Sequence, residues 1–304
     1  MKNLKIIILL LLVVLGGLFF FVTNEAKVST QKKPIVAVTT YALYDIVHHI
    51  AKDSVKIVNI LPFGVDPHSF EPTPKLMAAL EKSSLVIYSG AGLEPWTKGF
   101  VFHSKVIDMS RYVNLRRLKK GDDSMHMHNS VDPHYWLDFG NMQKATKVIT
   151  KALIELLPQN KKLYEEEESR YIAMLQNLDK LYKEHLSSCR VKSVVVSHNA
   201  LGYLARDYGF HVESLTGLSP EAEPSAKDVT RIMQDIKKEG VTTIFFEHFV
   251  NDSIIKRIAQ DAHIKLDVFQ PIGNITKDEA EAHLTYEDIM KKNLQKLSKA
   301  LMCQ

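Results

Sequence analysis

Apolar runs alternate with amphipathic stretches along the chain from residue 34 onward. Short β-branched runs predict buried strands, whereas apolar residues that recur every three or four positions predict helices. Strands are expected at 34–40, 55–61, 84–89, 105–108, 191–197, 210–215, 242–247 and 264–269. Helices are expected at 41–52, 73–81, 141–157, 160–186, 200–208, 225–239, 253–262 and 286–302. This alternation indicates parallel sheets and therefore an α/β fold.

The helix expected at 160–186 is long and contains neither glycine nor proline. It separates two groups of strands and helices, so we predict two lobes with parallel-sheet α/β cores joined by one long rigid helix. The expected division is an N-terminal lobe at 34–140, a helical linker at 141–187 and a C-terminal lobe at 190–304.

The first residues differ in character from the rest of the chain. Lys2 and Lys5 precede an unbroken apolar run at 6–22, which predicts a secretory signal peptide or an N-terminal anchor over residues 1–26. No cysteine follows this run directly, which argues against a bacterial lipoprotein anchor. The remainder is expected in the periplasm, with any membrane association made through this segment.

Charge and cysteine content narrow the function classes. The net charge of +4 is spread along the chain, and the one tight basic cluster, at 116–120, is followed by acidic residues. We interpret that cluster as a solvated loop and expect no nucleic-acid partner. Cys189 and Cys303 are the only cysteines, so an exported chain carries either one disulfide or two thiols.

Three histidines stand in similar local settings. His68 and His134 each follow an Asp-Pro pair, and His198 ends the apolar run of a predicted strand. Three imidazoles are enough protein ligands for zinc, and parallel sheets bind ligands beyond the carboxyl ends of their strands. We therefore expect a metal site between the lobes. The alternative is that these are ordinary histidines among the 13 in the chain.

Five segments together support a family resemblance. They are 64–74 (GVDPHSFEPTP), 92–96 (GLEPW), 132–138 (DPHYWLD), 197–205 (SHNALGYLA) and 219–225 (SPEAEPS). The chain resembles the zinc and manganese solute-binding proteins of bacterial ABC importers, and is most similar to the zinc-binding members. The resemblance implies two α/β lobes bridged by a rigid helix.

The resemblance also implies that His68, His134 and His198 are metal ligands, with Zn²⁺ favoured over Mn²⁺ because imidazole suits zinc. His126 and His128 look like a short form of the histidine-rich loop of zinc members, or are incidental surface residues. The family often carries an aspartate ligand where this chain has Gln270. Water, Gln270 or Glu247 is then the candidate for the fourth position, and Glu247 could instead hold a histidine ring. Glu94 and Trp96 are expected to pack structurally.

The expected function is high-affinity Zn²⁺ binding outside the cytoplasm by a monomer that delivers the metal to an ABC importer permease. The protein is not expected to be an enzyme. Two alternatives stay open: a surface adhesin or metal buffer, and a zinc-dependent hydrolase, since three histidines and a water can also be catalytic. The absence of an HExxH motif argues against the hydrolase.

Overall fold

The computed structural model describes residues 32–118, 131–218, 224–248 and 253–304. The predicted signal or anchor segment, His126 and His128 lie outside these residues. Residues 34–304 form one compact unit. Within the described ranges, no helix has both the length and the apolar character needed to cross a membrane.

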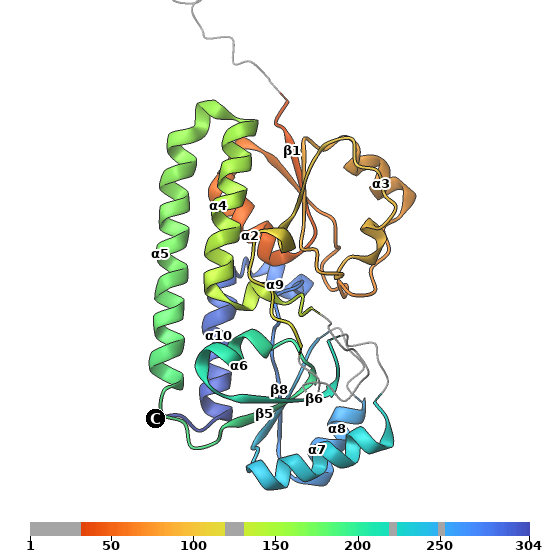
Figure 1. Ribbon diagram of the computed structural model, residues 1–304, viewed down its shortest axis with the longest axis vertical. Coiled ribbons are helices and arrows are strands. Elements are labelled where there is room, and N and C mark those ends of the chain that lie inside the picture. The colour runs from red at the N-terminus through yellow and green to blue at the C-terminus, as the bar shows by residue number, and fades with distance from the viewer. Residues whose placement is uncertain (1–31, 119–130, 219–223, 249–252) are drawn as a thin grey trace, which may run out of the picture. The chain divides into compact units, whose positions relative to one another are not determined.

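Two parallel four-stranded sheets organise the chain (Figure 1). The first has the order β2-β1-β3-β4 and is built from β1 (Ile35–Val38), β2 (Lys56–Asn59), β3 (Leu85–Tyr88) and β4 (Lys105–Asp108). The second has the order β6-β5-β7-β8 and is built from β5 (Ser193–His198), β6 (His211–Thr216), β7 (Thr243–Phe246) and β8 (Lys265–Val268). In each sheet the first strand in sequence lies between two other strands, β1 between β2 and β3 and β5 between β6 and β7.

Helices connect and cover these strands. They are α2 (Tyr41–Ala51), α3 (Pro74–Leu80), α4 (Phe139–Leu156), α5 (Lys161–Leu186), α6 (Gly202–Tyr208), α7 (Ala226–Glu239), α8 (Ser253–Ala262), α9 (Lys277–Glu281) and α10 (Tyr286–Ala300). The predicted α/β fold with two parallel-sheet cores is confirmed. The sixteen expected elements are all present, with ends that differ by about two residues.

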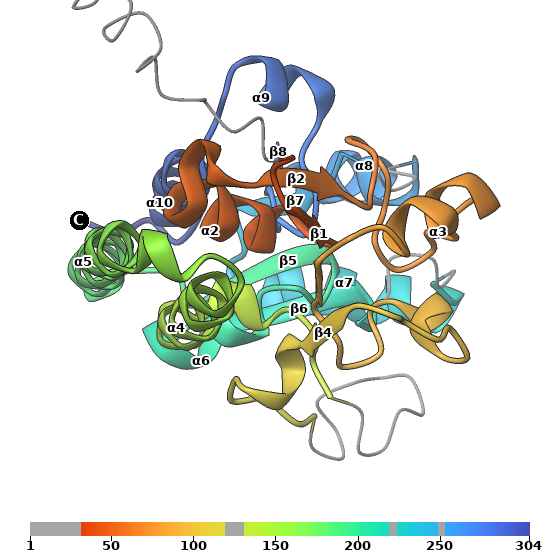
Figure 2. The same ribbon diagram turned by 90° about the horizontal axis from the view of Figure 1, so that it is seen from above.

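The long helix α5 supports both sheets rather than merely spanning the gap between them. It packs against α4 along most of its length, against α2 beside the first sheet and against α10 beside the second (Figures 1 and 2). Buried tyrosines on its inner face include Tyr164, Tyr171 and Tyr182, and one apolar core runs through both lobes. Because its apolar face packs against other helices along its length, α5 is a rigid support for both sheets. The exact lobe boundaries stay a prediction.

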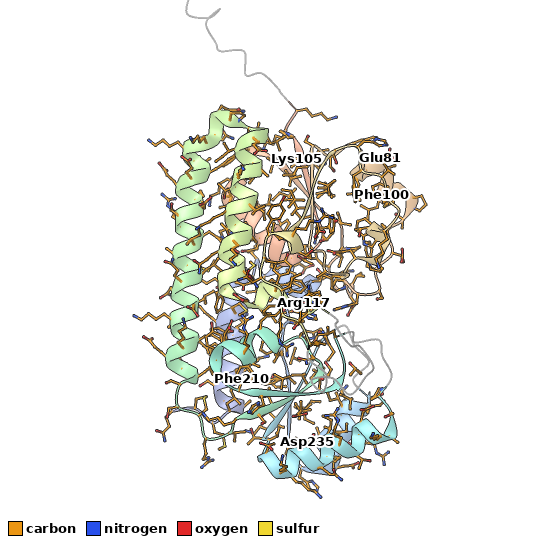
Figure 3. All side chains as sticks on the ribbon, viewed as in Figure 1. Glu81, Phe100, Lys105, Arg117, Phe210 and Asp235 are labelled. Carbon is orange, nitrogen blue, oxygen red and sulfur yellow. A yellow bond between two sulfur atoms is a disulfide. The ribbon has the colours of Figure 1, made fainter. Side chains whose placement is uncertain are left out.

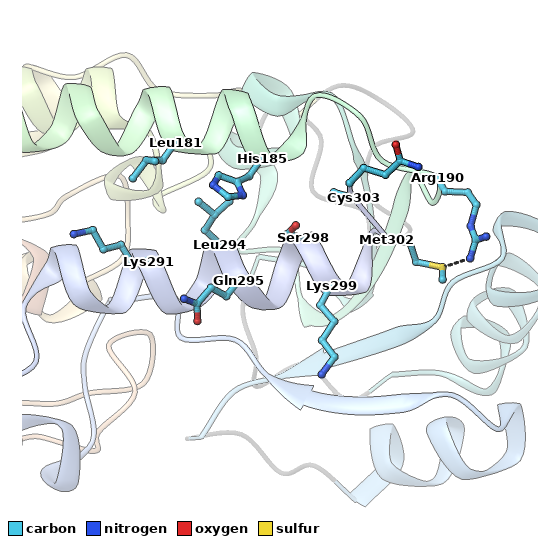
Figure 4. Close-up of a pocket in the computed structure, with 11 residues that line it drawn as sticks. Leu181, His185, Arg190, Lys291, Leu294, Gln295, Ser298, Lys299, Met302 and Cys303 are labelled. Atoms are coloured by element: carbon cyan, nitrogen blue, oxygen red, sulfur yellow. Dashed lines mark hydrogen bonds between the residues drawn. The ribbon is translucent and has the colours of Figure 1, made fainter.

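A disulfide joins Cys189, just after α5, to Cys303, just after α10. The sequence left this pairing open. Beside it, a groove of about 730 Å³ runs between the last turns of α5 and α10, and Figure 4 shows the basic side chains of Arg190, Lys291 and Lys299 around it. Cations near helix C-termini are favoured by the helix dipole, which accounts for part of this charge.

Among the described α-helices, α9 was not predicted from the sequence. The short helix α9 lies between the strand expected at 264–269 and the helix expected at 286–302, where no helix was predicted, and its residues offer no apolar stripe. A capping box begins it: the Thr276 side chain accepts from the backbone of Glu279, and the Glu279 side chain accepts from the backbone of Thr276. The Thr-x-x-Glu pattern was the available signal.

Candidate metal centre

Three histidine rings from separate segments converge where the two sheets face each other. His68 lies in the loop between β2 and α3, His134 directly precedes a 3-10 turn, and His198 is the last residue of β5. The Nε2 atoms of His68 and His198 each lie 3.3 Å from Nε2 of His134. No other cluster of three or more potential metal ligands is found in the described ranges. The structure thus brings together all three histidines that the sequence singled out.

The spacing of these nitrogens suits a tetrahedral ion. Two ligands about 2.05 Å from the centre of a tetrahedron lie about 3.3 Å apart. His134 and His198 are both only 2% exposed, so water competes little with the ion for these two rings. The donor set, three imidazole nitrogens, is typical of zinc rather than of harder cations.

The repeated Asp-Pro-His sequence has a local structural meaning. In both copies the aspartate accepts a hydrogen bond from the backbone N–H of the histidine two residues later. The N–H···Oδ1 distance is 2.6 Å from His68 to Asp66 and 3.0 Å from His134 to Asp132. This short turn, with proline fixing φ between the two residues, presents each histidine at a defined angle.

Two of the three histidine rings have a carboxylate beside Nδ1. Nδ1 of His134 lies 2.9 Å from Oδ1 of Asp132, and Nδ1 of His198 lies 2.5 Å from Oε1 of Glu247. A carboxylate at Nδ1 favours the tautomer that carries its proton there, which leaves the Nε2 lone pair free for a metal. Glu247 therefore contacts the His198 ring at Nδ1, while Nε2 of the same ring lies near His134.

The electrostatic environment differs among the rings. Burial and the two neighbouring imidazoles lower the pKa of His68 well below its usual range. Burial also works toward a lower pKa for His198, but the Glu247 carboxylate outweighs it and raises the pKa of that ring. His68 therefore stays neutral near pH 7, which is the form that binds a metal.

The cavity at the rings is small, at about 20 Å³. That volume suits one ion or one water and excludes an organic substrate. Its walls come from both lobes. They are formed by Asp66, Pro67, His68, His134, Trp136, His198, Glu247, Pro271, Gly273 and Asn274.

The loop after β8 closes one side of this cavity and is hydrogen-bonded to the first lobe. Trp136 Nε1 donates to the Pro271 carbonyl at 2.6 Å, and Tyr41 N donates to the Gly273 carbonyl at 3.1 Å. Asn274 donates to two carbonyls of the His68 loop. The sequence marked none of these three loop residues as part of the site. Pro271 and Gly273 contribute through backbone carbonyls, and Asn274 contributes through its side-chain amide.

Gln270 takes no part in the cavity, although the family resemblance made it a candidate ligand. Its Nε2 donates to Glu279 Oε2 at 2.8 Å, and its Oε1 accepts from the backbone N–H of Ile272 at 3.2 Å. Both ends of the amide are thus used to fix the loop and α9. Within the described ranges, neither Gln270 nor Glu247 belongs to the group of potential ligands formed by the three histidines.

Two further expectations concern residues outside the cavity. Glu94 is buried and accepts hydrogen bonds from Thr39, Ser89 and Gly90, so it packs structurally as expected. The interpretation of 116–120 as a solvated loop is wrong for Arg116, whose guanidinium lies 3.1 Å from the buried carboxylate of Asp132. A buried carboxylate attracts a cation, and the sequence did not show that the two segments meet.

Comparison with known proteins agrees with this geometry. Residues 36–300 match the family model described as zinc-uptake complex component A, periplasmic. The high-affinity zinc uptake system protein ZnuA of Bacillus subtilis is 32% identical over 278 residues, which cover 88% of this chain and 87% of that protein. The zinc-binding lipoprotein AdcA of Streptococcus pneumoniae is 29% identical over 279 residues, and the chain spans 54% of its length.

Solved structures are similar in the same way. The laminin-binding protein Lmb of Streptococcus agalactiae, described as a bifunctional adhesin and metal transporter, superposes with a TM-score of 0.80 at 27% identity, covering 88% of this chain and 99% of that one. The Zn(II)-bound ZnuA-like domain of Streptococcus pneumoniae AdcA gives a TM-score of 0.74 at 29% identity, with the same coverage.

Proposed function

This chain belongs to the family of the periplasmic component A of zinc-uptake complexes, and we propose that it is a high-affinity Zn²⁺-binding protein that delivers the metal to an ABC-type importer. His68, His134 and His198 hold the ion through their Nε2 atoms. The observation that carries this assignment is the 3.3 Å spacing of those nitrogens in a cavity of one-ion size.

Zinc is favoured over manganese by the chemistry of the donor set. Manganese prefers oxygen ligands and more of them, whereas three imidazoles and one water complete a tetrahedral zinc site. The two nearest carboxylates, Asp132 and Glu247, approach the rings from behind at Nδ1. They therefore strengthen the imidazoles as ligands.

A binding role fits the site better than catalysis. The family consists of zinc-uptake binding components rather than enzymes. A hydrolase needs room for its substrate beside the metal, and the cavity of about 20 Å³ provides none. Metal capture followed by transfer to a permease requires only that the site be reopened.

The protein acts outside the cytoplasm as a monomer, and its partner is the membrane permease of the importer. The apolar run at 6–22 supports export, either as a cleaved signal or as an anchor. Light scattering of the exported form checks the monomer, and intact mass of that form shows whether residues 1–26 remain.

An additional adhesin role is a second candidate, favoured only by likeness to the Streptococcus agalactiae protein described as bifunctional. Binding of the purified chain to immobilised laminin, with and without zinc, tests it.

The main experiment is zinc titration of chelator-stripped protein by calorimetry. One zinc per chain is expected, and the His134→Ala variant should bind far more weakly. His211→Ala is the matched control, because His211 is exposed at the start of β6. Wild-type affinity in His134→Ala, or no zinc binding by the unmodified chain, would overturn the assignment.

Delivery needs a cellular measurement. Cells that lack this chain but retain its importer should recover ⁶⁵Zn uptake with the wild-type chain and not with His134→Ala. Equal uptake with both forms would leave zinc binding without a transport role.

A further inference from the structure

Arg116 occupies a position that the zinc-binding role does not explain by itself. It belongs to the basic cluster of the sequence, but its side chain is only 20% exposed. Its neighbour Arg117, labelled in Figure 3 at the level where the two lobes meet, is exposed. The two adjacent arginines therefore have different environments.

The guanidinium of Arg116 is connected to a ligand ring through one carboxylate. Nη1 of Arg116 donates to Oδ2 of Asp132 at 3.1 Å, and Oδ1 of Asp132 accepts from both N and Nδ1 of His134. Asp132 is fully buried. Each carboxylate oxygen thus has its own partner, and rotation of the carboxylate would break the contacts on both sides.

Residues from both lobes surround Arg116. The backbone N–H of Arg116 donates to Tyr203 Oη at 2.8 Å, and Tyr203 Oη donates to the Asp132 carbonyl at 2.9 Å. Tyr203 lies on α6, which begins four residues after His198. A Cβ placed on Gly202 would lie only 2.3 Å from Nη1 of Arg116. The glycine leaves the space that the guanidinium fills.

We propose that Arg116 is a positioning residue for the metal centre: it fixes the Asp132 carboxylate so that the His134 ring presents Nε2 to the ion. This inference rests on the proposed zinc-binding function. Without the guanidinium, Asp132 is a buried charge with one partner fewer, and it can turn away from Nδ1. The His134 ring then loses its fixed orientation and tautomer.

A purely structural role makes a different prediction. If Arg116 only stabilises the junction of the lobes, its removal lowers the melting temperature of the metal-free protein and leaves the geometry of the bound metal unchanged. The test therefore needs a readout of metal geometry besides affinity and stability.

The experiment compares Arg116→Gln and Arg116→Lys with Arg117→Gln in the full chain. Zinc affinity is measured by competition with a chromogenic chelator, and site geometry by the visible spectrum of the Co²⁺-loaded protein. We expect Arg116→Gln to weaken zinc binding by roughly tenfold, as loss of an outer partner of a ligand does. Its Co²⁺ bands should shift and weaken. Arg116→Lys should recover part of the affinity, since Lys retains the charge, and Arg117→Gln should match the wild type.

Gly202→Ala provides a second test that keeps the arginine. Its methyl group displaces the guanidinium, so zinc binding should weaken by a similar factor although the helix itself tolerates alanine well. In an Arg116→Gln background the same substitution should add less than it does alone, because only the 3.0 Å approach of the new Cβ to Asp132 Oδ2 remains. If Arg116→Gln does not fold, Gly202→Ala can still be used to test the role of Arg116.

The outcomes separate this inference from the proposed function. If the wild type binds zinc and Arg116→Gln binds within twofold of it, Arg116 has no positioning role. An unchanged Co²⁺ spectrum with a lower melting temperature also overturns the inference and leaves a structural role. If the wild type itself binds no zinc, the proposed function fails first.

Discussion

The two lobes share one strand order, yet the central strands of their sheets end in different chemistry. β1 is followed by Thr39, and β5 ends in His198. In each lobe this residue meets a carboxylate that follows the neighbouring strand. The Thr39 hydroxyl lies 2.6 Å from Oε1 of Glu94, and Nδ1 of His198 lies 2.5 Å from Oε1 of Glu247.

The difference shows how one architecture serves two purposes. Glu94 also accepts hydrogen bonds from the backbone N–H groups of Ser89 and Gly90. It therefore has a structural role at the carboxyl end of the first sheet. Glu247 instead leaves the other side of an imidazole free to face the cavity. The parallel sheet supplies such a pair in both places, and a histidine at the strand end adds the imidazole nitrogen that we propose binds zinc.

The largest effect should come from exchanging the strand-end residues for alanine. His198→Ala removes a ligand, so zinc affinity should fall by more than about 100-fold, since loss of an outer partner alone costs ~10–100-fold. Thr39→Ala should leave zinc affinity unchanged. Chelator competition on both variants measures this, and a comparable loss in both would show that the lobes are not specialised as we infer.

The disulfide sharpens the comparison in a second way, because the first lobe contains no cysteine. Cys189 and Cys303 are separated by 114 residues, and a cross-link of that span typically stabilises by about 2–4 kcal/mol. Cys189→Ser should lower the free energy of unfolding of the metal-free protein by that amount, as measured in urea. Zinc affinity should stay the same, and two reactive thiols in unreduced protein would contradict the bond.

The two carboxylates should respond in opposite ways. Glu247→Ala is expected to weaken zinc binding by ~10–100-fold, because His198 loses the partner that sets its tautomer. Glu94→Ala removes the acceptor of the Thr39 hydroxyl and of the Gly90 N–H, whereas the Ser89 N–H keeps Thr39 Oγ1 as an acceptor. An unsatisfied buried donor costs roughly 1–3 kcal/mol, so the substitution should destabilise the fold. Its zinc affinity should be preserved under conditions where it is folded. Calorimetry measures the zinc affinity of both variants, and thermal melting measures their stability. The prediction is wrong if Glu94→Ala binds zinc more weakly than Glu247→Ala.

Much of this comparison was accessible from the sequence, because apolar runs report strands that are buried on both faces. His198 at the end of such a run and the two Asp-Pro-His segments gave the candidate site by residue. Helix α9 was missed because its residues have no apolar stripe, and only the capping residues Thr276 and Glu279 mark it.

The supporting contacts of the site were not accessible in the same way. Arg116 meets Asp132 because α6, far along the chain, leaves room at Gly202. The loop after β8 contributes backbone carbonyls, which no residue type reveals. The cysteine pairing likewise depended on how α5 and α10 pack. Local sequence patterns predict helices, strands and the types of ligand residue. Contacts between residues far apart in the sequence become known only from the folded structure.

A third histidine–carboxylate pair, outside the residues that line the cavity, gives the smallest predicted effect. His49 on α2 lies 3.3 Å from Oδ2 of Asp45, which is buried and also accepts from Tyr171 of α5 and the backbone of Tyr286 of α10. The hydrogen bond with Asp45 raises the pKa of His49, against opposing contributions from burial and Lys52. Unlike His198, this histidine does not line the cavity.

Because the pKa of His49 is raised, the pair with Asp45 changes the free energy of unfolding with pH in a defined direction. A histidine whose pKa is raised on folding stabilises the native state fully below its unfolded value near 6.5, and the contribution disappears as pH rises through the higher folded value. Metal-free wild type should therefore lose stability from pH 6 to pH 8 relative to His49→Gln. Urea unfolding at several pH values measures the difference, and parallel curves for the two proteins would refute it. Zinc affinity at pH 7.5 should be equal in both, because the pair lies outside the metal centre.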